Sequence, residues 1–462
     1  MDRPEDPDAA AAAFTADLAR RIESGELGPG TRLESLRDLA GRLGLSRHAV
    51  LGTYRRLAGA GLVQARHGSG FYVAAQGGLA GTARAPGIPG TPGLDRLLDT
   101  ALLIRGFLEP GPLLKCGSGV LPRDWLAGLG LQRHVRGAAG QANLHDYGTA
   151  LGYPPLRDAL QRRLERRRIP CAAGRILLTH GVSQGLELVL RAFCQSGDTV
   201  LVERPAYYNL FGLLQVSGLR TVAVARTPEG PDLEALEALL GSGCAPRVFF
   251  LQSLLHNPTG GSLGPAAAHR LLLLAERHDF LIVENDAYAD LAEDGDLRLA
   301  ALDGLRRVIY LAGYTKTVSA DLRVGLAAAA APVLDALARA KLITAIASSE
   351  FAERVLHRVL AEGGYDRFCA GLRHRLAAAQ ELLQTDLDQA GWEVFPGPRR
   401  GMFLWARHPR WPDSVPLARA AAGAGFWLAP GSAFEPDRAP SPWVRFNVAY
   451  RTPALAAWLR TA

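Results

Sequence analysis

Hydrophobic positions in the first 75 residues predict three short helices and a hairpin. Apolar side chains recur every three or four residues over 9–25, again after Ser35 and again after Ser46. Residues 62–73 then alternate between apolar and polar around a glycine-rich tip, as two paired strands do. Three helices followed by a hairpin are typical of a winged helix-turn-helix, whose later helix enters the major groove of DNA.

A different pattern begins near residue 112. Short apolar runs with strand character alternate with amphipathic helical stretches as far as about residue 330. Such alternation predicts an α/β domain whose mostly parallel sheet is covered by helices. A long helical region and short strands follow, which indicates a smaller α+β subdomain. The expected fold is therefore multidomain, with a winged helix-turn-helix followed by an α/β domain.

A segment of low complexity separates these regions. Fourteen of the twenty residues over 74–93 are glycine, proline or alanine. Such a segment has little to bury and is expected to be a flexible tether. The predicted organisation is a DNA-binding domain over 1–75, a linker over 76–111 and a larger domain over 112–462.

Composition narrows the class of protein. Hydrophobic residues make up 48% of the chain and charged residues 21%, which is a globular composition. No apolar run reaches the roughly 18–20 residues that a membrane span needs, and the N-terminus is acidic where a secretion signal is basic. We therefore expect a cytoplasmic protein with no membrane partner. The five scattered cysteines form no metal-binding motif, so neither disulfides nor a metal site is expected.

Positive charge is concentrated in the predicted DNA-binding domain. The chain carries a net charge of +7, and residues 31–75 hold seven arginines and two acids, a net charge of +5. Clustered arginine favours double-stranded DNA as a partner. The alternative is a small helical bundle with arginine on its solvated face.

Lysine is scarce, which makes each lysine informative. Only Lys115, Lys316 and Lys341 occur, because arginine serves nearly everywhere else as the cation. A lysine amine can lose its proton and attack a carbonyl, whereas an arginine guanidinium stays protonated. Lys316 follows a predicted strand, and the fork of Arg323, seven residues later, suits a phosphate dianion. The alternative for Lys316 is an ordinary surface lysine.

Other polar residues follow predicted strands, at the edge where open α/β sheets bind ligands. In THGVSQGLELVL a strand runs directly into a helix, which leaves the amides of Val182, Ser183 and Gln184 free at the helix start. Free amides and the helix dipole favour a phosphate there, although an ordinary capped helix has the same pattern. Asp286 ends a very apolar strand, where a carboxylate is costly unless it is paired.

The stretch GTRLESLRDLAGRLGLSRHAVLGTYRRLAGAGLVQARHGSGFYVA resembles the DNA-binding domain of GntR-type regulators along its whole length. The resemblance implies that the starts of the second and third helices and the wing contact DNA. The residues it singles out are Ser35, Arg37, Ser46, Arg47, His67 and Gly68. One departure is Glu34, where the family usually has proline, and an acid beside the phosphates would weaken or redirect contacts.

Residues from about 112 to 462 resemble the fold-type I aminotransferases, which carry pyridoxal 5′-phosphate (PLP). The resemblance rests on the segments DYGTALGYPPLRDAL, ERPAYYNL, HNPTG, LIVENDAYADL, YLAGYTKTVSADLRVG and WVRFNVAY. It implies an internal aldimine between PLP and Lys316, next to Thr315, with Arg323 on the phosphate. It further implies that Asp286 pairs with the pyridine nitrogen and keeps it protonated, which makes the ring an electron sink.

The same resemblance assigns further roles. Tyr207 stacks on the pyridine face, while Asn257 and Tyr288 share the phenolic oxygen. In the family, the arginine at the position of Arg445 binds the α-carboxylate of an amino acid. Tyr147 reaches the phosphate held by the partner subunit, so the active form is expected to be a homodimer.

Together these features resemble the MocR subgroup of GntR-type regulators. The resemblance implies a PLP-dependent transcription regulator that senses an amino compound, or PLP itself, through aldimine chemistry at Lys316. Exchange of the amine onto the cofactor would bias the placement of the DNA-binding domains on an operator. Two alternatives stay open: a PLP-free scaffold, and a working PLP-dependent aminotransferase with a DNA-binding module, whose catalytic residues would be Lys316, Asp286 and Tyr288.

Overall fold

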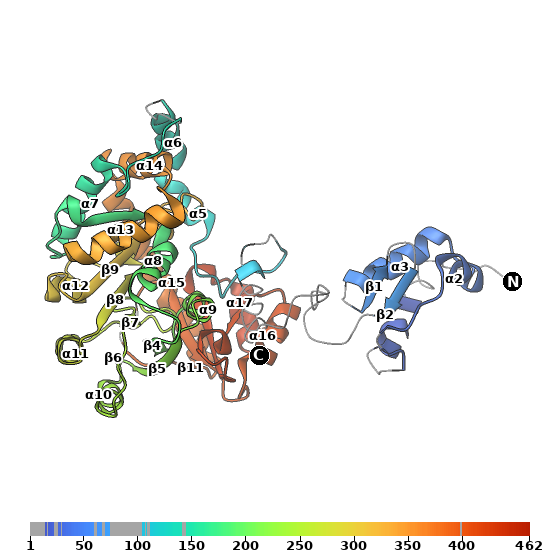
Figure 1. Cartoon of the computed structure of the whole chain (residues 1–462). Coiled ribbons are helices and arrows are strands. Elements are labelled where there is room, and N and C mark those ends of the chain that lie inside the picture. Colours follow the sequence, from blue (N-terminus) through green and yellow to red (C-terminus); the bar gives the residue numbers. More distant parts are fainter. Residues whose placement is uncertain are drawn as a thin grey trace. The chain divides into compact units, whose positions relative to one another are not determined.

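The computed structural model divides the chain into two compact units, Met1–Thr91 and Pro92–Ala462 (Figure 1). The residues that the structure describes are 14–15, 17–22, 26–28, 30–59, 62–66, 70–73, 104–106, 108, 111–140, 145–397 and 400–462. The domain boundaries expected from the sequence, near residues 75 and 111, stay predictions.

The first unit contains the expected helices and hairpin. Residues 17–22 are helical, and α2 (Leu36–Leu43), α3 (Arg47–Gly59), β1 (Val63–Arg66) and β2 (Gly70–Val73) follow. The two strands pair antiparallel. Their shared core consists of the side chains that the periodicity predicted, including Leu18, Ile22, Leu39, Val50, Tyr54 and Leu57. The predicted winged helix-turn-helix is therefore confirmed.

The second unit contains the remaining elements. Its α-helices are α5 (Arg123–Leu126), α6 (Leu131–Ala139), α7 (Pro154–Arg166), α8 (Gly181–Phe193), α9 (Tyr208–Val216), α10 (Leu233–Gly241), α11 (Pro265–Arg277), α12 (Leu299–Asp303), α13 (Ala331–Ala345), α14 (Glu350–Ala361), α15 (Tyr365–Gln389), α16 (Ser414–Gly423) and α17 (Pro453–Leu459). Short 3₁₀ helices are η1 (Ala127–Leu129), η2 (Ala173–Arg175), η3 (Ala289–Leu291), η4 (Gly431–Phe434) and η5 (Val448–Tyr450). Its strands are β3 (Ile176–Thr179), β4 (Thr199–Arg204), β5 (Arg220–Thr227), β6 (Gly230–Pro231), β7 (Val248–Leu251), β8 (Leu281–Asp286), β9 (Val308–Gly313), β10 (Gly325–Ala328), β11 (Glu393–Val394), β12 (Phe403–Arg407), β13 (Ala429–Pro430) and β14 (Trp443–Asn447).

The large sheet has the strand order β3-β10-β9-β8-β7-β4-β5-β6. Strands β9, β8, β7, β4 and β5 are parallel to one another, which confirms the predicted mostly parallel sheet. Strand β10 is antiparallel to both β3 and β9 and was not predicted. Its sequence, Gly-Leu-Ala-Ala, has little strand preference, but all four residues are buried between two neighbours. Tertiary packing therefore decides this strand.

Helices cover both faces of the large sheet (Figure 1). Along β8 the side chains alternate between the two faces. Val283 belongs to the core under α8, α9 and α13, whereas Ile282 belongs to the core under α7, α10, α11 and α12. Glu284 lies on the same face as Ile282, because its carboxylate accepts hydrogen bonds from two amides at the start of α12, each at 2.8 Å. This alternation determines which residues at the end of β8 face the ligand cavity.

The expected smaller α+β subdomain follows the large sheet in the chain. Its antiparallel sheet has the order β11-β12-β14-β13, and α15, α16 and α17 contribute side chains to the same core. Within the described ranges we find no helix with both the length and the apolar character of a membrane span.

Candidate functional site

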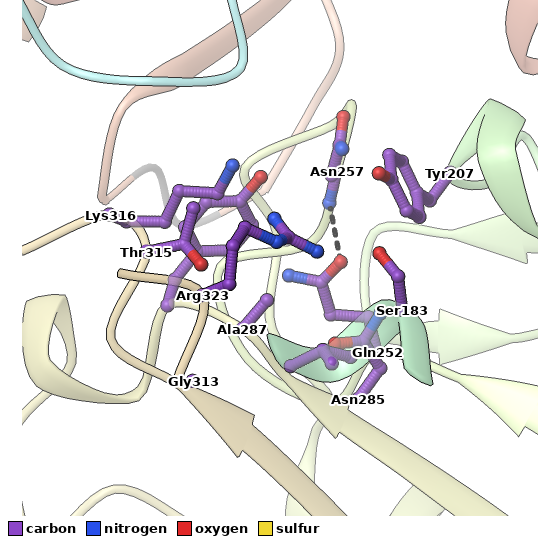
Figure 2. Close-up of a pocket in the computed structure, with 12 residues that line it drawn as sticks. Ser183, Tyr207, Gln252, Asn257, Asn285, Ala287, Gly313, Thr315, Lys316 and Arg323 are labelled. Atoms are coloured by element: carbon purple, nitrogen blue, oxygen red, sulfur yellow. Dashed lines mark hydrogen bonds between the residues drawn. The ribbon is translucent and has the colours of Figure 1, made fainter. Parts of the chain in front are cut away.

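A cavity with about 520 Å³ of empty space lies where β7, β8 and β9 end and α8 begins. The carboxyl ends of these parallel strands meet there, as expected for a ligand site in an open α/β sheet. Figure 2 shows side chains from several separate elements gathered around it. Eight of the predicted cofactor residues line it: Val182, Ser183, Tyr207, Asn257, Tyr288, Thr315, Lys316 and Arg323.

Lys316 follows β9 and lines the cavity (Figure 2). Its amine lies 6.0 Å from the centre of the Tyr288 ring. Desolvation by the surrounding protein, together with the positive charges of Arg445 and Arg323, lowers the pKa of the Lys316 amine to about 7. A substantial fraction of this amine is therefore uncharged at neutral pH and able to attack an aldehyde.

Lys341 is buried for a structural purpose. Its amine donates hydrogen bonds to the Ala150 carbonyl at 3.1 Å, to the Leu178 carbonyl at 2.9 Å and to the Ser348 hydroxyl at 2.9 Å. Burial lowers the pKa of Lys341 to about 8. These bonds join α13 to β3 and to the loop before α7, which accounts for a lysine outside the ligand cavity.

The start of α8, where an anion site was predicted, lies at the cavity. Gly181 has φ 71°, which glycine adopts without strain, and leads the chain from β3 into the helix. Amides of a first helical turn have no partner within the helix, and Val182 and Ser183 there line the cavity. The Arg323 guanidinium lies beside them and donates to the His180 carbonyl at 3.3 Å. A guanidinium and a helix N-terminus together suit a phosphate dianion.

Tyr207, Asn257 and Tyr288 line the cavity from three separate loops. Burial raises the pKa of both tyrosines, so their hydroxyl groups stay protonated and can donate hydrogen bonds. The backbone N–H of Asn257 donates to Gln252 Oε1 at 3.2 Å, the contact drawn as a dashed line in Figure 2. Asn257 Oδ1 accepts from Arg445 Nη1 at 2.7 Å, so this side chain is held in one orientation.

Arg445 is buried next to the cavity without forming part of its lining. Its Nη2 donates to the Gly117 carbonyl at 2.6 Å, and its guanidinium lies 4.6 Å from the Phe403 ring centre and 4.9 Å from that of Phe434. Through Asn257 it is one hydrogen bond away from the cavity. The predicted role in binding a carboxylate stays a prediction.

Two other predicted residues lie outside the cavity lining. Gln184 turns back along α8, and its Oε1 accepts from the His180 amide at 2.8 Å. Tyr147 is 81% exposed in the single chain. Exposure of this kind is consistent with a residue that serves a partner subunit, but the role stays a prediction.

The structure does not bring Asp286 into the cavity, contrary to the prediction. Its side chain is fully buried on the other face of β8, where Oδ2 accepts from Arg298 Nε at 2.8 Å and from the Tyr310 hydroxyl at 2.7 Å. The alternation of side chains along β8 is the reason, because Asp286 shares a face with Glu284. The carboxylate is paired, as its burial requires, with an arginine instead of a ligand.

Sequence reasoning missed four cavity residues, which are Gln252, Asn285, Ala287 and Gly313. The most informative is Asn285, whose Oδ1 is buried without a hydrogen-bond partner among the described residues. The period of two along β8 places Asn285 and Asp286 on opposite faces, but it does not by itself indicate which face lines the cavity.

Helix capping accounts for two of the predicted DNA-contact residues. The hydroxyl groups of Ser35 and Ser46 accept hydrogen bonds from the amides three residues ahead, at 3.2 Å and 3.1 Å, and so begin α2 and α3. Arg37, in the first turn of α2, is exposed. All three residues lie at the helix starts where the sequence placed them, and their contacts with DNA stay predictions.

The remaining DNA-contact predictions fall where the structure gives no description. Arg47 begins α3, but its side chain is outside the described part of the chain. His67 and Gly68, at the tip between β1 and β2, also lie outside the described residues. Their role in the wing stays a prediction.

Glu34, the departure from the GntR pattern, forms an ion pair with Arg42. The Glu34 carboxylate accepts from Arg42 Nη2 at 2.7 Å and from Nε at 3.1 Å, and both side chains are about half exposed. This acid therefore neutralises one of the arginines that would otherwise be available to phosphates.

We expect Glu34→Ala to bind DNA a few-fold more tightly at low salt, because the substitution removes a negative charge and releases Arg42. The plot of log affinity against log salt concentration should steepen by up to about one unit of slope, which corresponds to one additional released counterion. Fluorescence anisotropy with the full chain and a duplex of arbitrary sequence measures both quantities. Asp17→Ala, which breaks the exposed Arg20–Asp17 pair on the first helix, is the matched control. Unchanged or weaker binding by Glu34→Ala would contradict the expectation.

The chemistry of the cavity fits PLP. A lysine amine of lowered pKa suits the aldehyde, and an arginine at a helix start suits the phosphate. Asn285 Oδ1 is a buried polar atom that still lacks a partner among the described residues. Among all the residues that the structure describes, no group of three or more histidine, cysteine or acidic side chains is placed to hold a metal ion.

Comparisons with known families match both units. The model for aminotransferase class I and II matches residues 126–459, and the model for bacterial regulatory proteins of the gntR family matches residues 11–73. The uncharacterized HTH-type transcriptional regulator YdcR of Escherichia coli (strain K12) is 30% identical, over 94% of this chain and 94% of its own. The probable rhizopine catabolism regulatory protein MocR of Rhizobium meliloti is 28% identical, over 89% of this chain and 84% of its own.

A solved structure resembles the second unit. The α-aminoadipate aminotransferase LysN from Thermus thermophilus, complexed with N-(5′-phosphopyridoxyl)-L-leucine, gives a TM-score of 0.72 at 26% identity. The match covers 80% of this chain and 95% of that chain.

Proposed function

The chain belongs to the aminotransferase class I and II family and to the gntR family of bacterial regulatory proteins, the combination of MocR-type regulators, and from this we propose that it couples recognition of an amino compound to operator binding. It is a PLP-dependent, DNA-binding transcription regulator. The observation that carries the proposal is the Lys316 amine, with a pKa of about 7, in the same cavity as the anion site of Arg323 and α8.

PLP supplies an aldehyde that bonds reversibly to amines, and the cavity residues act around that property. Lys316 provides the resident amine. Arg323 and the first turn of α8 bind the phosphate, and Asn257 and Tyr288 hold the phenolic oxygen by hydrogen bonds. Tyr207 packs against the face of the ring.

The effector is an amino compound whose amine takes the place of Lys316. Arg445 supports a carboxylate on this compound, because its guanidinium lies next to Asn257 at the cavity edge. Release of Lys316 then changes the contacts between the large sheet and the smaller subdomain, and so biases the DNA-binding domains.

The regulator acts as a homodimer. Tyr147 is exposed, and so are Ile343 and Ile346 at the end of α13, at 88% and 50%. The hydrogen bond from Lys341 to Ala150 holds the loop that carries Tyr147 near this end of α13. Exposed apolar side chains gathered in one place mark an interface, and a second copy of the chain would bring Tyr147 to the neighbouring cavity. Sedimentation velocity that detects only monomers would contradict this.

A working aminotransferase is the alternative, and the comparisons do not favour it. The two relatives described above that match this chain over most of its length are both regulators. A DNA-binding regulator acts where the chromosome lies, so we propose a cytoplasmic location. Recovery of the protein in a membrane or secreted fraction would contradict that location.

We expect an effector amine to change operator affinity by about 5- to 150-fold, which corresponds to a coupling of about 1–3 kcal/mol. An operator duplex is first selected from a random library with the PLP-loaded full chain. Fluorescence anisotropy then measures its affinity with and without each member of a panel of amino acids and amines. The visible absorption band of bound PLP should shift at the same amine concentration.

The test variant for this experiment is Lys316→Arg, and its matched control is Lys115→Arg. Arginine keeps the positive charge but cannot bond to the aldehyde, so Lys316→Arg should lose the response, and Lys115→Arg should retain it. Spectral shifts with sustained keto acid formation and unchanged operator affinity would favour the aminotransferase alternative.

A further inference from the structure

Strand β8 presents Asn285, and not Asp286, to the PLP cavity. Val283 packs under α8, and the alternation then places Asn285 and Ala287 on the same side, where both line the cavity. Asp286 points the other way and is occupied by Arg298 and Tyr310. An amide therefore stands where the aminotransferase resemblance led us to expect a carboxylate.

The Asn285 side chain lacks a partner of its own. Its Oδ1 is buried and accepts no hydrogen bond from any described residue. Leaving such a group unpaired costs about 1–3 kcal/mol, so buried amides normally have a partner. A cavity on one side of this amide, and protein on the other, indicate that a ligand atom contacts the amide group, which can present either its oxygen or its NH₂ group to that atom.

The geometry of PLP identifies that ligand atom. In PLP the pyridine nitrogen lies across the ring from the aldehyde carbon, with the phenolic oxygen and the phosphate arm on the two flanks. Lys316 marks the aldehyde side of the cavity, and Ser183 and Arg323 mark the phosphate flank. Figure 2 shows Asn285 across the cavity from Lys316. The ring atom nearest to Asn285 is then the pyridine nitrogen.

We propose that Asn285 is the hydrogen-bond partner of the pyridine nitrogen of PLP and that its neutral amide leaves this nitrogen unprotonated. The inference rests on the proposed function, because PLP must occupy the cavity. The amide oxygen cannot serve here, because it and an unprotonated nitrogen are both acceptors; the amide therefore turns by roughly 180° around its Cβ–Cγ bond, and its NH₂ group donates to the nitrogen lone pair. A carboxylate at this point would hold a proton on the nitrogen by its charge, and an amide has no charge with which to do so.

An unprotonated ring nitrogen separates amine recognition from amine turnover. Exchange of Lys316 for an effector amine needs only the aldehyde carbon. Transfer of the amino group also needs removal of the α-proton, and the electron pair left behind must be accepted by the ring. A neutral pyridine accepts it poorly, so the bound amine is retained and not converted. Asn285 thereby suits the cavity to sensing.

The test measures the protonation of the ring nitrogen directly. The full chain is loaded with PLP labelled with ¹⁵N at the pyridine nitrogen, and its chemical shift is recorded by solid-state NMR. We expect the shift of a neutral pyridine for the natural protein and for Asn285→Ala, and the shift of a protonated pyridine for Asn285→Asp. Asp is nearly the same size as Asn, and Asn285 Oδ1 has no hydrogen bond in the described part of the chain to lose.

A second readout follows conversion of an amino acid. In a half-reaction the amine of the amino acid displaces Lys316, which leaves as a free amine. The α-hydrogen then moves as a proton to the former aldehyde carbon of PLP, water supplies the keto oxygen, and pyridoxamine phosphate and a keto acid result. We expect Asn285→Asp to form pyridoxamine phosphate about tenfold faster, or more, than the natural protein. A hydrogen bond to a charged group is stronger than one between neutral groups by a free energy that corresponds to about tenfold in rate.

Each outcome bears on the proposal. A protonated ring nitrogen in the natural protein would overturn it, and so would a neutral one in Asn285→Asp. A chain that retains no labelled PLP and shows no visible band would instead overturn the proposed function, and this inference with it. The two failures are distinguished because only the first yields a bound ¹⁵N signal.

Discussion

Reduction of the PLP-loaded chain with borohydride should attach the cofactor to Lys316 and to neither of the other two lysines. Lys316 has an amine of pKa about 7 inside a cavity that Arg323 and the start of α8 also line. Lys341 also has a lowered pKa, about 8, but its amine is engaged in three hydrogen bonds. Peptide mapping by mass spectrometry identifies the modified residue.

Lys316→Arg should lose the visible absorption band of bound PLP completely, while Lys115→Arg retains it. The rate at which the natural protein captures PLP should also depend only weakly on pH. An amine with a pKa of about 7 gains only about tenfold in its uncharged form between about pH 6 and pH 8, whereas an ordinary lysine gains about a hundredfold. Label on Lys341, or a hundredfold rise in the capture rate, would contradict this assignment.

Asp286→Ala should lower the free energy of unfolding of the second unit by about 3–5 kcal/mol, the usual cost of leaving one member of a buried ion pair without its partner. Asp286 and Arg298 are both fully buried, and the Tyr310 hydroxyl shares the same carboxylate oxygen. The substitution would leave the Arg298 charge without its counter-ion in the interior. Urea denaturation of the full chain, followed by the tryptophan fluorescence of the second unit, measures the change.

Glu393→Ala is the matched control for this prediction. It breaks the ion pair with Arg407, whose two side chains are about half exposed, and such pairs contribute about 0–1 kcal/mol. An Asp286→Ala chain as stable as Glu393→Ala would show that the buried pair does not hold β8 in place. It would also reopen a ligand-binding role for this carboxylate.

Local patterns in the sequence were sufficient for the first unit. Its helices follow from apolar side chains at helical spacing and from Ser35 and Ser46 as caps, which are interactions between residues close in the chain. The wing contacts at His67 and Gly68 stay predictions, since these residues lie outside the described part.

Motif order was sufficient for most of the cavity. Tyr207, Asn257, Tyr288 and Lys316 each follow a predicted strand, and parallel strands bring their carboxyl ends to one edge of the sheet. The sequence by itself therefore determined that these side chains would meet. The resemblance of these segments to the fold-type I aminotransferases implied PLP as the cofactor, and the match to the aminotransferase class I and II family supports it.

Only the tertiary structure decided which of two adjacent residues faces the ligand. Strand β8 is covered by helices on both faces, so its first three residues are all apolar and its last three all polar, and the sequence carries no alternation that marks the cavity face. A shift of one residue exchanges the faces, and with it Asp286 for Asn285. Two contacts with other elements resolve that choice. Val283 packs under α8, and Asp286 pairs with Arg298, which precedes α12.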